Sequence, residues 1–477
     1  MIRFRFLSVS AVNGRLPDRS SPGEKMQSQG TRKRIAVVGA GISGLSAAWL
    51  LAKRYEVVLY ERDDRLGGHS NTVYVDGAAG PVPVDTGFIV YNELTYPNLT
   101  ALFDHLGVRT KASEMSFAVS RDGGRLEYCG AGIGGLFAQK RNIANPRFWS
   151  MLRDLFRFYN SAAGDLASLS ASHTLGDYLD RHRYGVAFRD DHLMPMAGAI
   201  WSAPCAAILG YPASAFIRFF HNHGLLLLGG RPPWRTVDGG SIAYVRRLVE
   251  DFTGHIRLQA DIGSIERRDG GVVVHDRKHG AEHFNDVVMA THADQALELL
   301  ADPSPMEREL LGAFGYSRNE AVLHTDVNAM PRRRAVWSSW NHVDGGPDDE
   351  AVAVTYWMNR LQGLDTQLPM LVTLNPSTPV REDLVLHRET YHHPLFDRSA
   401  IEAQQRLWTL QGQRGTWYCG AYFGAGFHED GLQSGLAVAE ALGGIRRPWS
   451  VAAESSRIAL PETWPVTFGQ KPAEIAA

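Results

Sequence analysis

The strongest constraint on this chain is a strand, a glycine-rich turn, a helix and a second strand that follow one another near its N-terminus. Residues 34–38 (RIAVV) form a short apolar run, typical of a parallel strand that is buried on both faces. Gly39, Gly41 and Gly44 follow with the spacing GxGxxG. In such a turn the first glycine permits the tight bend, the second lets the backbone approach a pyrophosphate, and the third lets helix and strand pack closely.

The rest of this unit offers a partner for a ribose. Apolar residues recur at helical spacing after the glycines, and the free N–H groups of the helix start, which includes Ser43, favour phosphate binding. The second strand, 56–60, is followed by Glu61, 22 residues after Gly39. This carboxylate can accept both hydroxyls of an adenosine ribose. The order of strand, helix, strand and acid predicts a dinucleotide site.

The continuation of the motif indicates which dinucleotide is bound. The stretch ERDDRLGGH resembles the ExxxRxGG signature of FAD-binding flavoproteins, in which the arginine and glycines hold ADP and its pyrophosphate. The alternative, a nicotinamide-binding Rossmann unit, usually lacks this second half, so we predict FAD. The predicted contacts in this stretch are Glu61, Arg62, Arg65, Gly67, Gly68 and His69. His69 stands where amine-oxidase-type relatives often carry arginine.

A second match lies near the C-terminus. Residues 417–435 (WYCGAYFGAGFHEDGLQSG) and the apolar stretch after them have the pattern strand, glycine-rich loop, helix. They resemble the closing FAD segment of phytoene-desaturase and amine-oxidase-like proteins, with Gly420 and Gly431 as contacts. Many relatives carry an acid directly after the first of these glycines. Ala421 stands there in this chain, and Asp430 is the predicted substitute for a flavin hydroxyl.

Three weaker matches occur in the order that the flavoprotein pattern expects. Residues 256–262 resemble the strand whose backbone meets the adenine, with Ile262 at the contact position. Residues 286–292 resemble the strand that returns beneath the flavin, with Ala290 at its end. Residues 84–88 resemble the stretch that passes near the flavin in amine oxidases. The predicted contacts there are Thr86, Gly87 and Phe88.

These motifs predict an α/β fold: an FAD-binding Rossmann-like domain of the glutathione-reductase type with an interleaved α+β substrate domain. Residues 1–30 lack periodicity and are predicted to be a disordered leader, and 446–477 an irregular tail. The predicted FAD-binding segments are 31–90, 225–300 and 411–445, and the predicted substrate-domain segments are 91–224 and 301–410.

The most unusual part of the substrate segments is 193–217, which carries no formal charge. Its length and hydrophobicity suit a membrane span, but Pro195, Pro204 and Pro212 argue against one continuous helix. Two alternatives remain: buried helical turns of the substrate domain, or an apolar pocket or monotopic dip that admits a lipid chain. In the second insert, alternating patterns predict antiparallel strands at 321–326, 335–340, 351–358 and 371–375.

Composition excludes several classes of partner. With 49 basic and 51 acidic residues the net charge is −2, which gives no general attraction to nucleic acid. The runs 332–334 and 446–447 are expected to be solvated faces. Three scattered cysteines form no disulfide framework and fit a reducing, cytoplasmic interior, with membrane association as a variant of that location. The histidine pairs 221/223 and 392/393 lack companion ligands, so no metal is predicted.

The chain as a whole resembles the FAD-dependent amine-oxidase/phytoene-desaturase superfamily. More narrowly, residues 84–92, 199–202 and 234–240 resemble bacterial proteins known as predicted NAD/FAD-binding proteins. Members of that group are commonly encoded beside cyclopropane-fatty-acid-synthase-like methyltransferases. The resemblance therefore implies a hydrophobic, acyl-chain type of substrate, peripheral membrane contact, and such a methyltransferase as partner.

One absence bears on the chemistry. Typical amine oxidases hold a lysine-bound water near flavin N5, but this chain has no lysine from His279 to Gln470. This favours a desaturase or dehydrogenase that passes hydride to flavin N5 over an amine oxidase; a third alternative is a non-catalytic flavoprotein partner of a methyltransferase. Candidates for the catalytic base are His428, Glu429 and His324, each of which also has a structural interpretation.

Overall fold

The computed structural model describes residues 32–170, 173–201, 205–227, 229–230, 232–344 and 353–462. From Lys33 onward the described chain forms one compact unit. The predicted leader, the end of the predicted tail, Pro204 and the first two residues of the predicted strand 351–358 lie outside the described residues. Because one compact unit covers both kinds of segment, the predicted domain limits stay a prediction.

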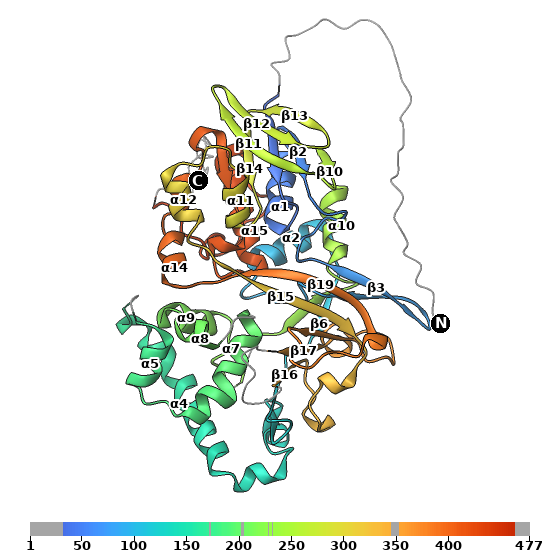
Figure 1. Cartoon of the computed structure of the whole chain (residues 1–477), viewed down its shortest axis with the longest axis vertical. Helices are drawn as coiled ribbons and strands as arrows, with labels where there is room; N and C mark the ends of the chain where they lie inside the picture. The colour runs from blue at the N-terminus through green and yellow to red at the C-terminus, as the bar shows by residue number, and fades with distance from the viewer. Residues whose placement is uncertain are drawn as a thin grey trace, which may run out of the picture. The chain divides into compact units, whose positions relative to one another are not determined.

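A parallel five-stranded sheet carries the N-terminal motif. Its strand order is β10-β2-β1-β14-β20, and every neighbouring pair is parallel (Figure 1). The central strand β1 is buried from Ile35 to Val38, as its unbroken apolar run predicts. The strands are β1 (Arg34–Val38), β2 (Glu56–Tyr60), β10 (His255–Arg257), β14 (Asp286–Met289) and β20 (Thr416–Tyr418).

Two helices from opposite ends of the sequence pack against each other beside this sheet. They are α1 (Ile42–Leu51), which is buried on all sides, and α15 (His428–Gly443). The two helices approach each other so closely at Gly435 that an added Cβ would overlap the carbonyl oxygen of Ser43. Glycine is therefore needed there for close approach, since any side chain would push the two helices apart.

A larger sheet is formed by the predicted substrate segments. Its order is β19-β15-β18-β17-β16-β7-β8, antiparallel except for the pair β16–β7. The antiparallel pattern expected for the second insert is thus present. The strands are β7 (Phe117–Arg121), β8 (Leu126–Cys129), β15 (Tyr316–His324), β16 (Trp340–Val343), β17 (Val354–Trp357), β18 (Leu371–Leu374) and β19 (Val385–Pro394).

Two of the strand predictions need correction, and one strand was not predicted. The predicted strand 335–340 begins with the end of a 3-10 turn, Arg334–Val336, and continues without regular structure until β16 starts at Trp340. The predicted strand 256–262 is two strands, because the chain leaves the parallel sheet after Arg257 and starts an antiparallel one at Ile262. Strand β19 was not predicted, since its half-exposed polar residues hide the alternation.

The apolar segment 193–217 is itself mostly helical. Its described residues form three short helices, most of whose side chains are buried, so the alternative of buried helical turns is the one observed. Figure 1 places them beside α4 and α5. Over the ranges that the structure describes, no helix combines the length and hydrophobicity of a bilayer span. The helices here are α4 (Pro146–Asp165), α5 (Leu175–Arg181), α6 (Val186–Phe188), α7 (Met194–Trp201), α8 (Cys205–Leu209) and α9 (Ala213–Asn222).

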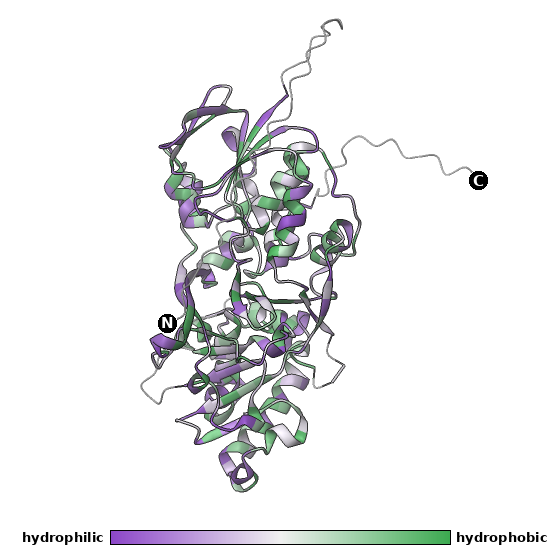
Figure 2. Cartoon of the chain, turned by 90° about the vertical axis from the view of Figure 1, so that its right-hand side faces the viewer, coloured by the Kyte–Doolittle hydropathy of each residue, from purple (hydrophilic) through white to green (hydrophobic). Residues whose placement is uncertain are grey.

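Many of the helices have one buried face. In Figure 2, hydrophobic and hydrophilic residues alternate along these helices, as one buried face requires.

Helix α2 (Pro97–Leu106) packs on α15, although residues 91–224 were predicted to belong to the substrate domain. The remaining strands are β3 (Thr72–Gly77), β4 (Gly80–Asp85), β5 (Val90–Asn92), β6 (Thr110–Ser113), β9 (Trp234–Val237), β11 (Ile262–Arg268), β12 (Gly271–Asp276) and β13 (Gly280–Phe284). The remaining helices are α3 (Gly132–Leu136), α10 (Ile242–Glu250), α11 (Ala293–Leu299), α12 (Pro305–Leu311), α13 (Met358–Leu361) and α14 (Arg398–Gln404).

The basic pair 446–447 is not a solvated face. Arg447 is 3% exposed and pairs with Glu440 at 2.8 Å, while its other nitrogens reach Asn98 and Glu440. The expectation was wrong for Arg447, because a sequence run of two arginines does not reveal a buried carboxylate one helical turn inside α15. The tail thereby ties α2 to α15.

We expect Gly435→Ala to separate α1 from α15 and to lower the free energy of unfolding by about 1–3 kcal/mol, the usual cost of overpacking. The matched control is Gly164→Ala in α4, where an added Cβ meets nothing within 4 Å. That change should leave stability equal or raise it by about 0.5–1 kcal/mol, because alanine favours a helix. Thermal denaturation of both variants checks this; equal melting temperatures would contradict the close-approach argument.

Candidate functional site

The first glycine turn forms a tight junction between β1, α1 and β14. Gly39 has φ +102°, and an added Cβ would lie 2.7 Å from the carbonyl oxygen of Ala290. At Gly44 an added Cβ would overlap the carbonyl oxygen of Gly39 and lie 3.0 Å from the Ala290 side chain. Gly41, in contrast, has nothing within 4 Å of an added Cβ. The turn therefore leaves no room for a side chain at Gly39 or Gly44, whereas the space next to Gly41 is open.

The second glycine pair docks against this opening. The N–H of Gly67 donates to the carbonyl oxygen of Ala40 at 2.9 Å, and an added Cβ at Gly68 would lie 3.1 Å from the Cα of Gly41. Arg65 holds the loop, since its Nη1 donates to the carbonyl oxygen of Gly68 at 2.8 Å and it pairs with Glu389 at 3.6 Å. Arg65 thus positions the loop within this structure.

Glu61 lies where a ribose acid is expected. Its Oε2 accepts the N–H of Ala40 at 2.7 Å and its Oε1 the N–H of Asp63 at 3.0 Å. Each oxygen keeps a second lone pair for a hydroxyl. The N–H of Ala260 donates to the carbonyl oxygen of Glu61 at 2.8 Å, so the chain that leads to Ile262 passes beside this acid. Arg62 is exposed at the rim.

The closing segment meets the first turn, as the paired motifs require. An added Cβ at Gly431 would lie 2.9 Å from Cγ2 of Ile42 and 3.4 Å from Oγ of Ser43. The N–H of Gly420 donates to Oγ of Ser434 at 3.0 Å, which fixes the loop on the helix that follows. The start of α15 and the start of α1 therefore lie side by side, and each presents the positive end of a helix dipole.

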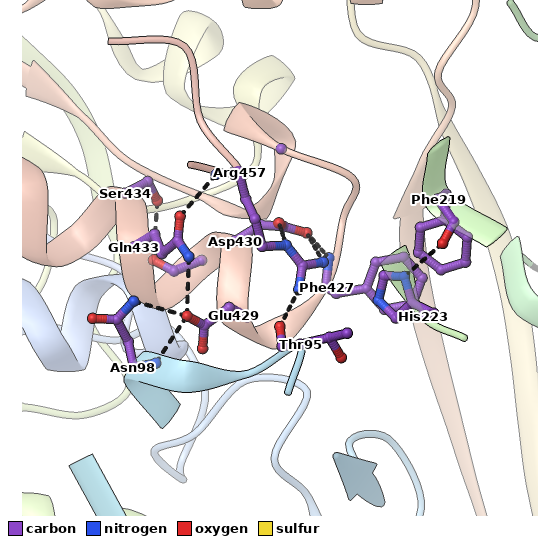
Figure 3. Close-up of polar contacts among 12 residues, drawn as sticks. Thr95, Asn98, Phe219, His223, Phe427, Glu429, Asp430, Gln433, Ser434 and Arg457 are labelled. Atoms are coloured by element: carbon purple, nitrogen blue, oxygen red, sulfur yellow. Dashed lines mark hydrogen bonds and ion pairs between the residues drawn. The ribbon is translucent and has the colours of Figure 1, made fainter. Parts of the chain in front are cut away.

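Asp430 is bound within the protein. It accepts the N–H of Phe427 at 2.7 Å, which caps α15, and pairs with Arg457 at 2.6 Å (Figure 3). Burial raises the pKa of this carboxyl, and the Arg457 guanidinium opposes that rise. Its contact with a flavin hydroxyl stays a prediction; in this structure Oδ2 accepts hydrogen bonds, while Oδ1 is buried in the ion pair with Arg457 and accepts no hydrogen bond from the described residues.

Two of the three base candidates are engaged in structural contacts. Glu429 accepts the N–H of Asn98 at 3.1 Å and of Leu99 at 3.0 Å, and also a side-chain amide of Gln433 at 3.0 Å (Figure 3). It caps the start of α2 from within the core. His324 is fully buried, between Oγ1 of Thr373 and the N–H of Asp326. Neither geometry favours proton transfer from a substrate.

His428 is the third candidate and lies beside another predicted contact. Its ring stacks on Phe88 with centroids 3.8 Å apart, and its Nε2 is 2.8 Å from the hydroxyl of Tyr244 and 3.0 Å from that of Ser70. Burial lowers the pKa of His428 to about 3. The imidazole is therefore neutral near pH 7 and shares a short hydrogen-bonded network.

A cluster of aromatic and imidazole rings adjoins the second glycine pair. His69 lies 4.9 Å from Tyr391 and 5.5 Å from His393 between ring centroids, and the Tyr391 hydroxyl is 2.8 Å from Oγ1 of Thr86. An added Cβ at Gly87 would overlap the carbonyl oxygen of His69. Burial lowers the pKa of His69 and of His393 to about 3.

Five residues beside the site were not predicted: Tyr391, His393, Glu389, Ser70 and Tyr244. All five lie on β19 or α10, or shortly after the second glycine pair, and no local motif marks them. The only signal was the adjacent pair His392–His393, which was considered as a metal site. Among the residues described, no three His, Cys, Asp or Glu side chains gather as a metal site requires.

The residues fit a bound FAD. The opening at Gly41, faced by Gly68, leaves room for a pyrophosphate, and α1 begins without a side-chain cap on its N–H groups. Glu61 and the backbone near Ile262 are the residues predicted to border the adenosine end, and Thr86, Phe88 and the start of α15 those predicted to border the flavin end. The fold and site thus define a flavin-binding oxidoreductase. Two glycine-rich junctions between a strand and a helix, one near each end of the chain, meet at its predicted FAD site.

Comparison with known proteins gives the family. The family model described as flavin containing amine oxidoreductase matches residues 42–360. The chain belongs to the flavin-containing amine oxidoreductase family. This confirms the predicted superfamily, fold class and FAD cofactor, and the class of FAD-dependent oxidoreductase.

Curated relatives match over short stretches. An L-amino acid oxidase of Cerastes cerastes is 32% identical over 120 residues, 22% of this chain and 22% of the relative. Protoporphyrinogen oxidase 2 of Arabidopsis thaliana is 41% identical over 80 residues, 17% of this chain and 15% of the relative. The matches therefore span less than a quarter of those proteins.

Solved structures match over most of the chain. A putative protoporphyrinogen oxidase from Exiguobacterium sp. 255-15 has a TM-score of 0.64 at 17% identity, covering 88% of this chain and 99% of its own. A CLA-producing fatty acid isomerase from P. acnes has a TM-score of 0.61 at 15% identity, covering 87% and 99%. Putrescine oxidase has a TM-score of 0.64 at 15% identity, covering 86% and 98%. At these identities the similarity shows the fold alone.

We expect Gly41→Val to abolish most FAD binding without loss of stability. The backbone at this position has φ −70°, which any residue adopts, and the added side chain meets open space where a pyrophosphate would lie. FAD affinity, measured by quenching of flavin fluorescence, should fall at least about tenfold, which corresponds to about 1.4 kcal/mol. The melting temperature of the protein without FAD should be unchanged. Normal FAD affinity in this variant would refute the assigned cradle.

The buried neutral histidines should make the fold acid-sensitive. Burial lowers the pKa of His223 to about 3, whereas an unfolded histidine has a pKa of about 6.5. The unfolded state therefore binds more protons below pH 6.5, so the free energy of unfolding falls as pH falls, by about 2 kcal/mol for such a group at pH 5.

Urea unfolding at pH 7.5 and pH 5 checks this. His223→Leu should lose less stability over that interval than the unmodified protein. His221→Leu, an exposed neighbour, should lose as much as the unmodified protein. Equal losses in His223→Leu and the unmodified protein would contradict the burial argument.

Proposed function

We propose that this protein oxidises a hydrophobic, acyl-chain type of substrate by hydride transfer to FAD, as a desaturase or dehydrogenase. The observation that carries the proposal is the absence of lysine from His279 to Gln470, which includes every residue of β14 to β20. The lysine-held water expected of an amine oxidase therefore has no donor on those strands. Aromatic and neutral imidazole rings border the same region.

The chain's own residues would hold the cofactor and exclude water. Gly41 and Gly68 would frame the pyrophosphate, the start of α1 would donate N–H groups to it, and Glu61 would accept ribose hydroxyls. When bound, FAD supplies a hydride acceptor at N5 of its ring system. Phe88 and His428 form a stacked wall beside the closing segment, and the Tyr244 hydroxyl fixes the orientation of the His428 ring.

Two observations support an acyl chain as the substrate. The described residues of helices α7 to α9 contribute mostly apolar, buried side chains to the substrate segments. One of the solved structures with the same fold is named a fatty acid isomerase. A methyltransferase partner is proposed on the sequence resemblance alone.

Amine oxidation is the second candidate. It is favoured by the family model and by relatives named L-amino acid oxidase and putrescine oxidase. In that reaction a substrate nitrogen lone pair assists hydride loss, and no separate base is needed. A redox-silent flavoprotein that supports a methyltransferase is the third candidate.

Anaerobic mixing of the FAD-loaded protein with substrates separates the three. We expect acyl phospholipids or free unsaturated acids to bleach the flavin absorbance near 450 nm, by roughly the whole oxidised band, because a hydride on the flavin removes that transition. Primary amines, including putrescine, should leave it unchanged. Bleaching by amines instead would support the second candidate, and bleaching by neither the third. Gly41→Val protein mixed with free FAD controls for flavin that is not bound.

A further inference from the structure

An exposed apolar patch lies on the segment that runs from α3 into α4. Ile133 is 78% exposed, Ile143 58%, Trp149 50% and Phe156 44%. Four large hydrophobic side chains within 24 residues of sequence are thus left open to water. Isolated exposed hydrophobics need no explanation, but a group of them marks a binding surface.

Local contacts connect the segments that carry three of these side chains. The indole N–H of Trp149 donates to the backbone carbonyl oxygen of Ile143 at 2.8 Å, and the Trp149 ring lies 5.5 Å from that of Phe137. The backbone N–H of Phe137 donates to the carbonyl oxygen of Ile133 at 3.1 Å. The exposed residues from Arg125 to Arg157 are called the α3–α4 face below.

Packing of the fold does not account for this face. Helix α4 already buries its inner side, including Phe148, Met151 and Phe158, and packs there against α6 and α9. Trp149 and Phe156 lie seven residues apart, two turns along the outer side. The helix therefore carries apolar side chains on both sides, and among the described residues only its inner side is packed against the rest of the protein.

The same face is basic. Between Gly123 and Gly164 the exposed ionisable residues are all cations, whereas the whole chain has a net charge of −2. These exposed cations are Arg125, Lys140, Arg141, Arg147, Arg153 and Arg157.

Acidic groups only partly balance these cations. Glu127 and Asp154 are fully buried; Glu127 pairs with Arg333, and Asp154 is shared by Arg153 and Arg157. Arg147 pairs with Asp191 and Asp190 of the π-helical turn Arg189–Leu193, and Arg125 pairs with Asp122. Among the described residues Lys140 and Arg141 have no carboxylate partner. A positive excess therefore remains around the apolar side chains.

We propose that the α3–α4 face docks on the surface of anionic membranes. Tryptophan and aliphatic side chains enter the boundary between headgroups and acyl chains, and lysine and arginine approach lipid phosphates. An aliphatic side chain such as Ile133, between two exposed glycines, enters a lipid layer but offers no ring for a nucleic-acid base. The face is separate from segment 193–217, whose described residues are mostly buried.

Sedimentation of the full, FAD-loaded chain with vesicles tests this. Vesicles with 30% phosphatidylglycerol in phosphatidylcholine should bind the protein at low salt, and those of pure phosphatidylcholine at least tenfold more weakly. The double variants Ile133→Ser with Trp149→Ser, and Lys140→Glu with Arg141→Glu, should each weaken binding to anionic vesicles at least tenfold. Leu368→Ser and Arg246→Glu, exposed elsewhere, are the matched controls and should bind as the unmodified protein.

The outcome does not depend on the proposed function, since vesicle binding is measured without turnover and flavin absorbance reports that the site is intact. All variants change exposed side chains and should keep the melting temperature of the unmodified protein. If one of the two double variants is less stable, the other double variant alone decides the test. No binding to anionic vesicles, equal loss in the control variants, or binding of a DNA duplex through the same residues in place of vesicles would each overturn the proposal.

Discussion

The structure depends on the approach of α15 to α1, two helices that lie almost 400 residues apart in the sequence. At Gly431 and Gly435 the lack of a side chain lets α15 lie directly against the start of α1. Without those two contacts the closing loop could not reach the first glycine turn. Two positive helix ends would then not face the same region, and a pyrophosphate with its ribityl chain would be held at one end only. The parallel sheet supports this arrangement, since β14 and β20 return the chain to the edge where β1 ends.

Much of the nucleotide-binding half could be predicted from sequence. The bounds of β1 and β2 agree with the predicted strands, because unbroken apolar runs and glycine spacing are local signals. The convergence of the two glycine motifs was also predicted, since both were recognised as parts of one pattern. The helix after the first glycines was found for the same reason, since its apolar residues recur at helical spacing.

The parts that could not be predicted depend on partners far away in sequence. Glu429 was considered as a base, yet it holds the N–H groups of Asn98 and Leu99, and nothing in its own segment indicates that α2 begins there. Tyr391 and His393 lie beside the glycine pair because β19 pairs with β15 along its whole length, and the polar alternation of β19 conceals it as a strand. Arg447 appeared to be a surface charge because its buried partner, Glu440, was not visible.

The last described residues also have a consequence for how the protein acquires its cofactor. Arg447 and Arg457 join α2 to α15 from a stretch that leaves the ribosome after every strand of the two large sheets. Strand β20 and α15 are likewise made after every other element of the two sheets, so a nascent chain that has not yet reached them holds only half of the nucleotide cradle. Binding of the coenzyme by both helix ends therefore has to wait for the synthesis of α15.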